Sequence, residues 1–134
     1  MADTDIRINL HDAETVDARS VPHYEPGNAI TGDVVLTTTS AINCRGVYLR
    51  LQWHTEGRGD RDEQRIQEVV LNNGALSSNA TVRQNFRFDL PREPWSFAGH
   101  YINIIWEIDV TIDLPMAADI HKTQPFVLAP KRTV

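Results

Sequence analysis

The sequence lacks most of the features that identify a function directly. Cys44 is its one cysteine, so no disulfide can form within the chain, and a reducing compartment such as the cytoplasm is the expected location. No apolar run approaches the roughly 20 residues of a membrane span, and we expect no secretion signal before Ile6. Peripheral association with a membrane stays open, because it needs no spanning segment.

The charge balance and the missing motifs exclude several classes of function. A net charge of −5 argues against a nucleic-acid surface, which needs clustered lysine and arginine. There is no glycine-rich phosphate loop, and Ser96 lacks the Gly-x-Ser-x-Gly pattern of a nucleophile elbow. Cys44 lies in an apolar stretch, where cysteine usually behaves as a small hydrophobic residue. We therefore expect a protein that is not an enzyme and holds no metal or cofactor.

The clearest pattern in the chain is an alternation between Pro94 and Pro115. Apolar residues from Ile102 to Ile112 share one parity and include Trp106, whereas polar residues, among them Glu107, fall on the other. A period of two predicts a strand with one face in the core and the other in water. Its length exceeds that of a typical strand, so we expect it to be the strand with which others pair.

Similar alternation elsewhere predicts an all-β fold. The stretch 64–71 fits a helix as well as a strand, but the turn signal Asn72-Asn73-Gly74 favours the strand. Segments 11–21 and 116–124 show no regular period and are expected to be loops. The count of seven to eight strands with no convincing helix predicts an immunoglobulin-like, two-sheet antiparallel sandwich that forms a single domain over residues 1–134. The predicted strands lie near residues 6–10, 30–36, 47–53, 64–71, 82–90, 102–112 and 126–128.

Three segments together resemble the amino-terminal domain of the arrestin-like superfamily. Residues 24–34 contain a Pro-Gly turn followed by Ile-x-Gly-x-Val, and residues 44–53 form the apolar strand that follows. Residues 90–115 carry Pro-x-Ser-Phe-x-Gly, a strand with Tyr and Trp, and Ile-Asp-Leu-Pro at the end. Phe126-Val127 stands where the family has its closing Phe-x-Val. Each motif alone is weak, but the set covers most of the chain in the expected order.

The resemblance implies a binding function, with departures from the family pattern. The superfamily includes eukaryotic arrestins, a cargo-sorting retromer subunit and bacterial sporulation-control proteins. Its members look like adaptors, so the resemblance implies an adaptor role for this chain. The usual second sandwich domain is missing from this chain, and so is a stretch for the amphipathic helix of vertebrate arrestins. Arg7 stands alone where a lysine pair is usual, which puts phosphate sensing in doubt. The resemblance therefore carries over the fold but not the partner.

Candidate site residues lie in the charged connection 54–62 and around the start of the long strand. The acidic residues and His54 could build a metal or acid–base site, but their spacing matches no motif and favours a solvated loop. Trp95 is expected to cap the sandwich end, with an exposed binding platform as the alternative. The residues expected to contact a partner are His54, Glu56, Arg58, Asp60, Trp95 and Tyr101.

The leading hypothesis is a non-catalytic adaptor or scaffold that binds another protein through end loops or an edge strand. One alternative is a small-ligand or carbohydrate-binding sandwich, with Trp95, Tyr101 and the 54–62 loop as its site. Another is a structural subunit that self-associates into a homo-oligomer. The sequence does not name the partner, and it does not say which sheet edge is open.

Overall fold

A computed structural model describes residues 4–11, 15–16, 21–59, 61–99 and 101–130, and within them it contains strands and no helix. Seven strands are long, which confirms the predicted count, and the other three contain two or three residues each. The strands are β1 (Thr4–His11), β2 (Thr15–Val16), β3 (Pro22–Tyr24), β4 (Ala29–Thr38), β5 (Gly46–Gly57), β6 (Glu63–Asn73), β7 (Thr81–Asp89), β8 (Phe97–Ala98), β9 (Ile102–Asp113) and β10 (Ile120–Leu128).

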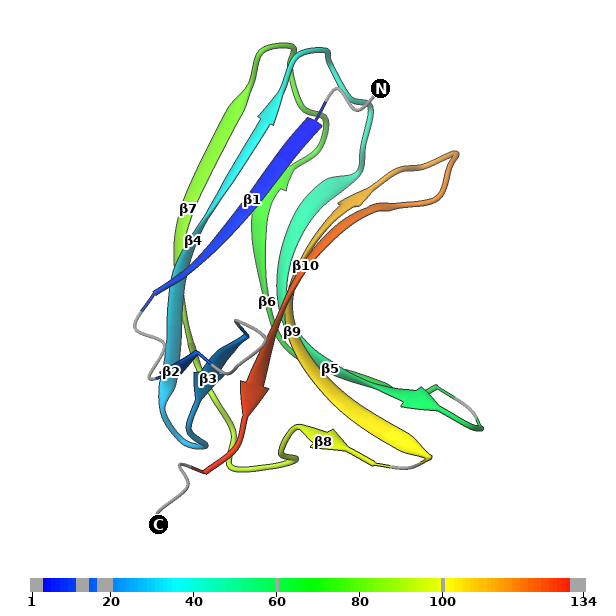
Figure 1. The fold of residues 1–134 in the computed structure, drawn as a ribbon. Helices are drawn as coiled ribbons and strands as arrows, with labels where there is room; N and C mark the ends of the chain where they lie inside the picture. Colours follow the sequence, from blue (N-terminus) through cyan, green and yellow to red (C-terminus); the bar gives the residue numbers. More distant parts are fainter. Residues whose placement is uncertain (1–3, 12–14, 17–20, 60, 100, 131–134) are drawn as a thin grey trace.

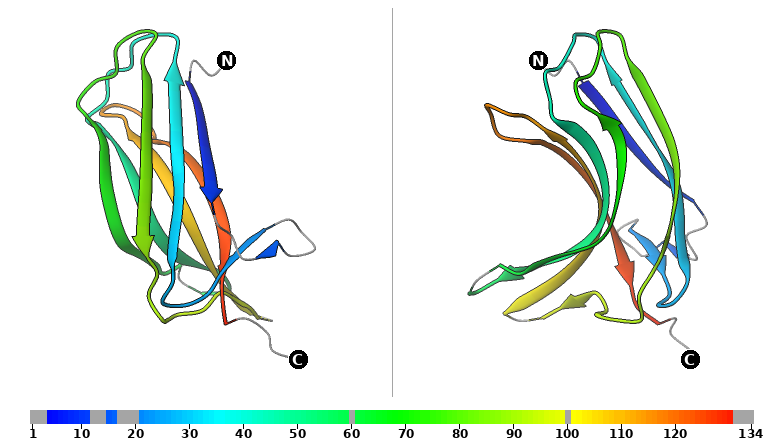
Figure 2. Two further views of the ribbon diagram at one scale, coloured as in Figure 1. Left: turned by 90° about the vertical axis from the view of Figure 1, so that its left-hand side faces the viewer. Right: turned by 180° about the vertical axis from the view of Figure 1, so that it is seen from behind.

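The strands form two sheets that pack face to face (Figures 1 and 2). The smaller sheet has the order β1-β4-β7, and the larger has the order β2-β3-β10-β9-β5-β6, with β8 added beside β9. All pairs are antiparallel except β3 and β10, which run parallel. The predicted all-β sandwich is therefore confirmed, with one parallel pairing.

Strand β9 is the long central strand that the sequence predicts. It pairs with β5 from Asp113 to Ile102, along its whole length. On its other side it pairs with β10 from Ile112 to Trp106, and β8 then takes over at Ile104. Both edges of β9 are thus occupied, so its backbone hydrogen bonds are satisfied within the sheet.

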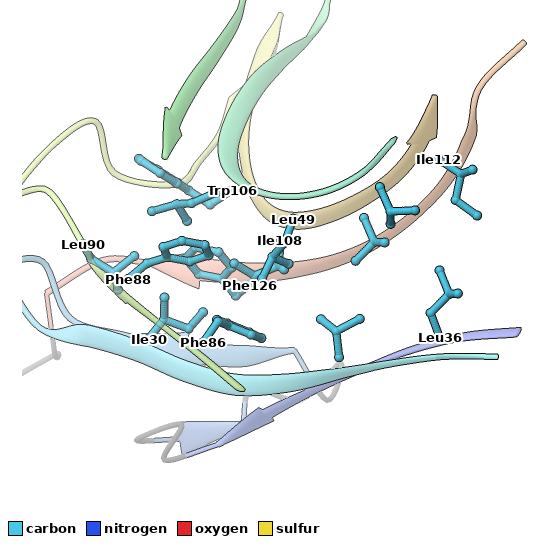
Figure 3. Packing of buried hydrophobic residues seen from close by; sticks show 14 of the residues in the cluster. Ile30, Leu36, Leu49, Phe86, Phe88, Leu90, Trp106, Ile108, Ile112 and Phe126 are labelled. Carbon is cyan, nitrogen blue, oxygen red and sulfur yellow. The ribbon is translucent and has the colours of Figure 1, made fainter. Parts of the chain in front are cut away.

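The core lies between the two sheets and is built from the apolar parity of β9 and its neighbours (Figure 3). Trp106 is fully buried, and its ring centroid lies 6.0 Å from that of Phe126. The Trp106 indole N–H donates a hydrogen bond of 2.8 Å to the Pro94 carbonyl, which satisfies the one polar atom of the side chain. From the smaller sheet, Ile30, Leu36 and Phe88 face this cluster.

The other face of β9 does not lie in water, so this part of the prediction is wrong. Glu107, Asp109 and Thr111 are 6%, 2% and 1% exposed. The larger sheet is strongly bent, and its concave side points away from the smaller sheet (Figure 1). Side chains converge on a concave surface, and those of β5 and β10 flank β9 on both sides. The polar row is therefore covered by its own neighbours.

Two segments expected as loops contain strands. Within 11–21, Thr15 and Val16 form β2, which pairs with β3. In the second segment β10 begins at Ile120 rather than near Phe126. The first half of β10 is mostly exposed, so no buried face imposes an alternation on its sequence. Pairing with β9 holds it in place instead.

Truncation of the central tryptophan tests the packing of β9. We expect Trp106→Ala to lower the free energy of unfolding by about 3–5 kcal/mol, because it leaves a large cavity in the core. The matched control is Trp95→Ala, which removes the same side chain from an exposed position and should change stability by about 0.5 kcal/mol or less. Urea denaturation measures both, and a Trp106 loss below about 1 kcal/mol would contradict this packing.

Candidate functional site

The predicted site residues lie at one end of the bent sheet. His54 and Glu56 belong to the last part of β5, and Arg58 follows directly after it. Because Gly57 pairs with Ile102, the end of β5 and the start of β9 meet at this end. Asp60 lies outside the described residues.

Arg58 and Tyr101 are in direct contact across this end. The Arg58 guanidinium lies 5.3 Å from the centre of the Tyr101 ring, and the Arg58 backbone N–H donates to the Tyr101 carbonyl at 3.0 Å. Gly57 allows this approach: its φ is +138°, and an added Cβ would overlap the Tyr101 carbonyl. The sequence-based grouping of Arg58 with Tyr101 is therefore matched by a contact.

His54 lies within the buried polar row rather than in a solvated loop. Its Nδ1 is 2.9 Å from Oε1 of Glu107, and its Nε2 is 2.9 Å from Oε2 of Glu56. The Gln52 side-chain amide donates to the same Glu107 oxygen at 3.0 Å. His54 and Glu107 are both almost fully buried, so the bonds from Gln52 and His54 to Glu107 join β5 to β9 on the concave face. The interpretation of His54 as part of a solvated loop is wrong.

The polar row continues along the concave face with a second group of contacts. Arg50 donates to Glu68 at 2.7 Å and to the Thr111 hydroxyl at 3.3 Å. The Thr111 hydroxyl donates to Asp109, and His121 Nδ1 lies 3.4 Å from Asp109. Each buried charge thus has a polar partner, as low exposure requires.

Sequence reasoning missed Gln52, Glu107 and their neighbours. A signal was present, because Gln52 and His54 share a parity on one strand and Glu107 lies on the polar parity of another. Only the register, in which Gln52 faces Glu107, shows that these side chains meet. Strand order and register are not visible in a single sequence, so the contact was not predictable.

The second feature of this end is a group of exposed apolar side chains, which we call the aromatic end. It consists of Trp95, Phe97, Tyr101 and Ile102, with exposed fractions of 52%, 57%, 58% and 46%. Ile102 has the core-facing parity of β9, but β5 and β9 extend beyond the smaller sheet here (Figure 1). Apolar positions that would be buried farther along β9 are therefore uncovered.

The aromatic end is tethered to the body of the protein. The Trp95 indole N–H donates to the Arg92 carbonyl at 2.8 Å, and Phe97 pairs with Ile104 of β9. The Trp95 side chain is 52% exposed and does not cap the core, so the expectation that it does is wrong. A hollow of about 370 Å³ between Pro94, Phe97 and Ile104 adjoins it.

A hollow of about 280 Å³ lies beside the aromatic end and is lined by Glu56, Arg58, Arg61 and Ile102, among other residues. A larger one, of about 620 Å³, lies at the opposite end of the sandwich, around Ile42, Leu114 and Met116. Its described lining residues carry no titratable side chain, so it offers no acid or base.

The remaining candidates for chemistry are accounted for by packing. Burial raises the pKa of the Cys44 thiol, which lies 3.3 Å from the Gly74 carbonyl, so little thiolate forms near neutral pH. Within the described residues, no three His, Cys, Asp or Glu side chains are grouped so as to hold a metal ion. The same residues form no helix that is long and apolar enough to cross a membrane.

Comparison with known proteins identifies the fold. No protein-family model matches the chain, and no curated protein matches its sequence. Among solved structures, the crystal structure of Spo0M, a sporulation control protein from Bacillus subtilis, matches with a TM-score of 0.67 over 98% of this chain. The fold is arrestin-like. The predicted resemblance is thereby confirmed at the level of the fold.

The match to Spo0M is low in sequence identity and covers only part of the Spo0M chain. The two sequences are 14% identical, so the likeness concerns the arrestin-like fold alone. This chain spans 51% of the length of the Spo0M chain.

Removal of the shared carboxylate tests the polar row. We expect Glu107→Ala to lower the free energy of unfolding by about 1–3 kcal/mol, because it leaves the buried amide of Gln52 and the ring of His54 without their acceptor. Glu56→Ala is the control, since Glu56 is exposed and its loss removes only one bond of His54. Thermal or urea unfolding compares the two, and equal small losses would show that Glu107 is not structurally important.

Proposed function

We propose that the protein is a non-catalytic, arrestin-like module that binds another protein through the aromatic end. The observation that carries the proposal is the gathering of exposed Trp95, Phe97, Tyr101 and Ile102 at one tethered end. Exposed apolar patches mark interaction sites, and the few residues that supply most of the binding energy of an interface are often Trp, Tyr and Arg. Holding them on paired strands reduces the entropy that binding must overcome.

The contacts of Tyr101 favour a protein partner over a sugar. Carbohydrate sites generally need an open aromatic face, but the Arg58 guanidinium already lies over the Tyr101 ring. The mixed charges of Glu56, Arg58, Arg61 and Glu93 around the apolar residues instead resemble the polar rim of a protein interface. Spo0M is described as a sporulation control protein, and a regulatory role exercised through protein contacts in the cytoplasm fits the same proposal.

Capture from the native host's lysate, with matched variants, tests this function. The surface variant is Phe97→Ala with Tyr101→Ala, and the control is Val70→Ala with Met116→Ala, which removes exposed apolar side chains elsewhere. We expect the wild type and the control to capture a specific protein in similar amounts. The amount captured by the surface variant should be lower by about tenfold or more.

Two results would contradict the proposal. Equal loss in both variants would indicate general apolar adhesion rather than a site. Retention of every captured protein by the surface variant would exclude the aromatic end as the docking surface. Unfolding curves of both variants should match that of the wild type, because the truncated side chains lie on the surface.

A further inference from the structure

The outer edge of β7 is a regular strand edge without a partner strand. β7 ends the order β1-β4-β7, and it pairs with β4 from Thr81 to Asp89 with no shift of register. Within the described part of the chain, no backbone hydrogen bond joins its outer edge to another strand. Figure 2 shows β7 at the side of the smaller sheet, with β4 between it and β1. Such an edge offers a template for an added strand.

Carbonyl groups of β7 are occupied by side chains instead of by a strand. The Gln84 amide donates to the Asn85 carbonyl at 2.8 Å, and Gln67 of β6 donates to the Asp89 carbonyl at 3.3 Å. When a backbone donor replaces such a side-chain donor, the exposed glutamine amide hydrogen-bonds to water instead. Because Gln67 covers the Asp89 end, the accessible edge extends from Thr81 to Phe88.

The long edges of β6 and β1 differ from that of β7 in ways that disfavour strand addition. β6 has two register shifts against β5, near Tyr48 and near Gln52, and such irregularities disrupt the edge. β1 is regular, but the charges on its outer face are matched: Arg7 lies 2.9 Å from Asp5, and His11 lies 2.8 Å from Asp33. β1 therefore carries little charge preference for an incoming strand.

The side chains of β7 define what an added strand should carry. Arg83 and Arg87 lie four residues apart on the outer face, and Arg83 forms no ion pair among the described residues, whereas Arg87 lies 3.2 Å from Asp89. On the inner face Phe86 and Phe88 are buried, whereas Gln84, which shares their parity, is exposed. An incoming strand would place acids opposite the arginines and apolar side chains on the face that it shares with Phe86 and Phe88.

We propose that the β7 edge binds an extended segment of a partner protein in which acidic and apolar residues alternate. This extends the proposed binding function to a second surface. The protein's own net charge of −5 makes the prediction specific, because general attraction would favour a basic segment. A preference for acidic residues must therefore come from Arg83 and Arg87.

The test is a titration of isotope-labelled protein, followed by nuclear magnetic resonance, with two synthetic peptides as long as β7. One peptide alternates glutamate with valine, and the other alternates lysine with valine. We expect the glutamate peptide to shift the β7 amide signals and slow their hydrogen exchange, and to bind about tenfold or more tightly than the lysine peptide.

Arg83→Glu and Arg7→Glu form a matched pair of variants. Both residues face Val35, one on each side of β4, so the two changes are equal in charge and lie in one row of the same sheet. We expect Arg83→Glu to weaken binding of the glutamate peptide about tenfold and Arg7→Glu to leave it within about twofold. Phe97→Ala should bind the peptide as the wild type does, which separates this surface from the aromatic end.

Several outcomes would overturn the proposal. These are equal binding of the two peptides, absence of shifts in β7, shifts that map to β1, and equal loss in the two arginine variants. Sedimentation of the protein alone tests whether a second copy of the chain binds the β7 edge instead. A dimer that forms with rising concentration and is abolished by Arg83→Glu would show that a second copy, not an acidic segment, takes the β7 edge.

Discussion

The two-sided pairing of β9 is the constraint on which the rest of the structure depends. β5 pairs with one edge of β9 along its whole length, and β10 and β8 divide the other edge between them. The apolar parity of β9 then forms the wall of the core, with Trp106 at its centre. Its polar parity is joined to β5 through Gln52, His54 and Glu107. Both faces of one strand therefore connect the parts of the fold, one to the core and the other to β5.

The same constraint explains why apolar side chains are exposed at one end. β9 extends beyond the smaller sheet, so the alternation that buries Trp106 leaves Ile102 uncovered. Phe97 joins it because β8 pairs with this overhanging part of β9. The free-energy cost of exposing these residues is offset by the apolar side chains that the rest of the sheet buries. A surface produced in this way is well suited to binding, because its side chains are held in place before a partner arrives.

The sequence predicts the strands wherever apolar and polar residues alternate along a segment. This holds for β9, β4 and β5, whose periods of two place Trp106, Leu36 and Leu49 in the core. It fails for the first half of β10, which is mostly exposed on both sides, and it does not show that the polar face of β9 is buried as well. The contact of His54 with Glu107 depends on register between distant strands, which local patterns do not encode. The approach of Arg58 to Tyr101 depends on the same pairing.

Native-state hydrogen exchange of the backbone amides tests the central position of β9 most directly. The account predicts that the amides from Trp106 to Ile112 are among the slowest in the protein and exchange only when the whole molecule unfolds. Amides in β1 and β8, which have a partner strand on one side only, should exchange through local opening. Exchange in β9 as fast as in β1, or slowest exchange in the smaller sheet, would contradict the claim that β9 organises this fold.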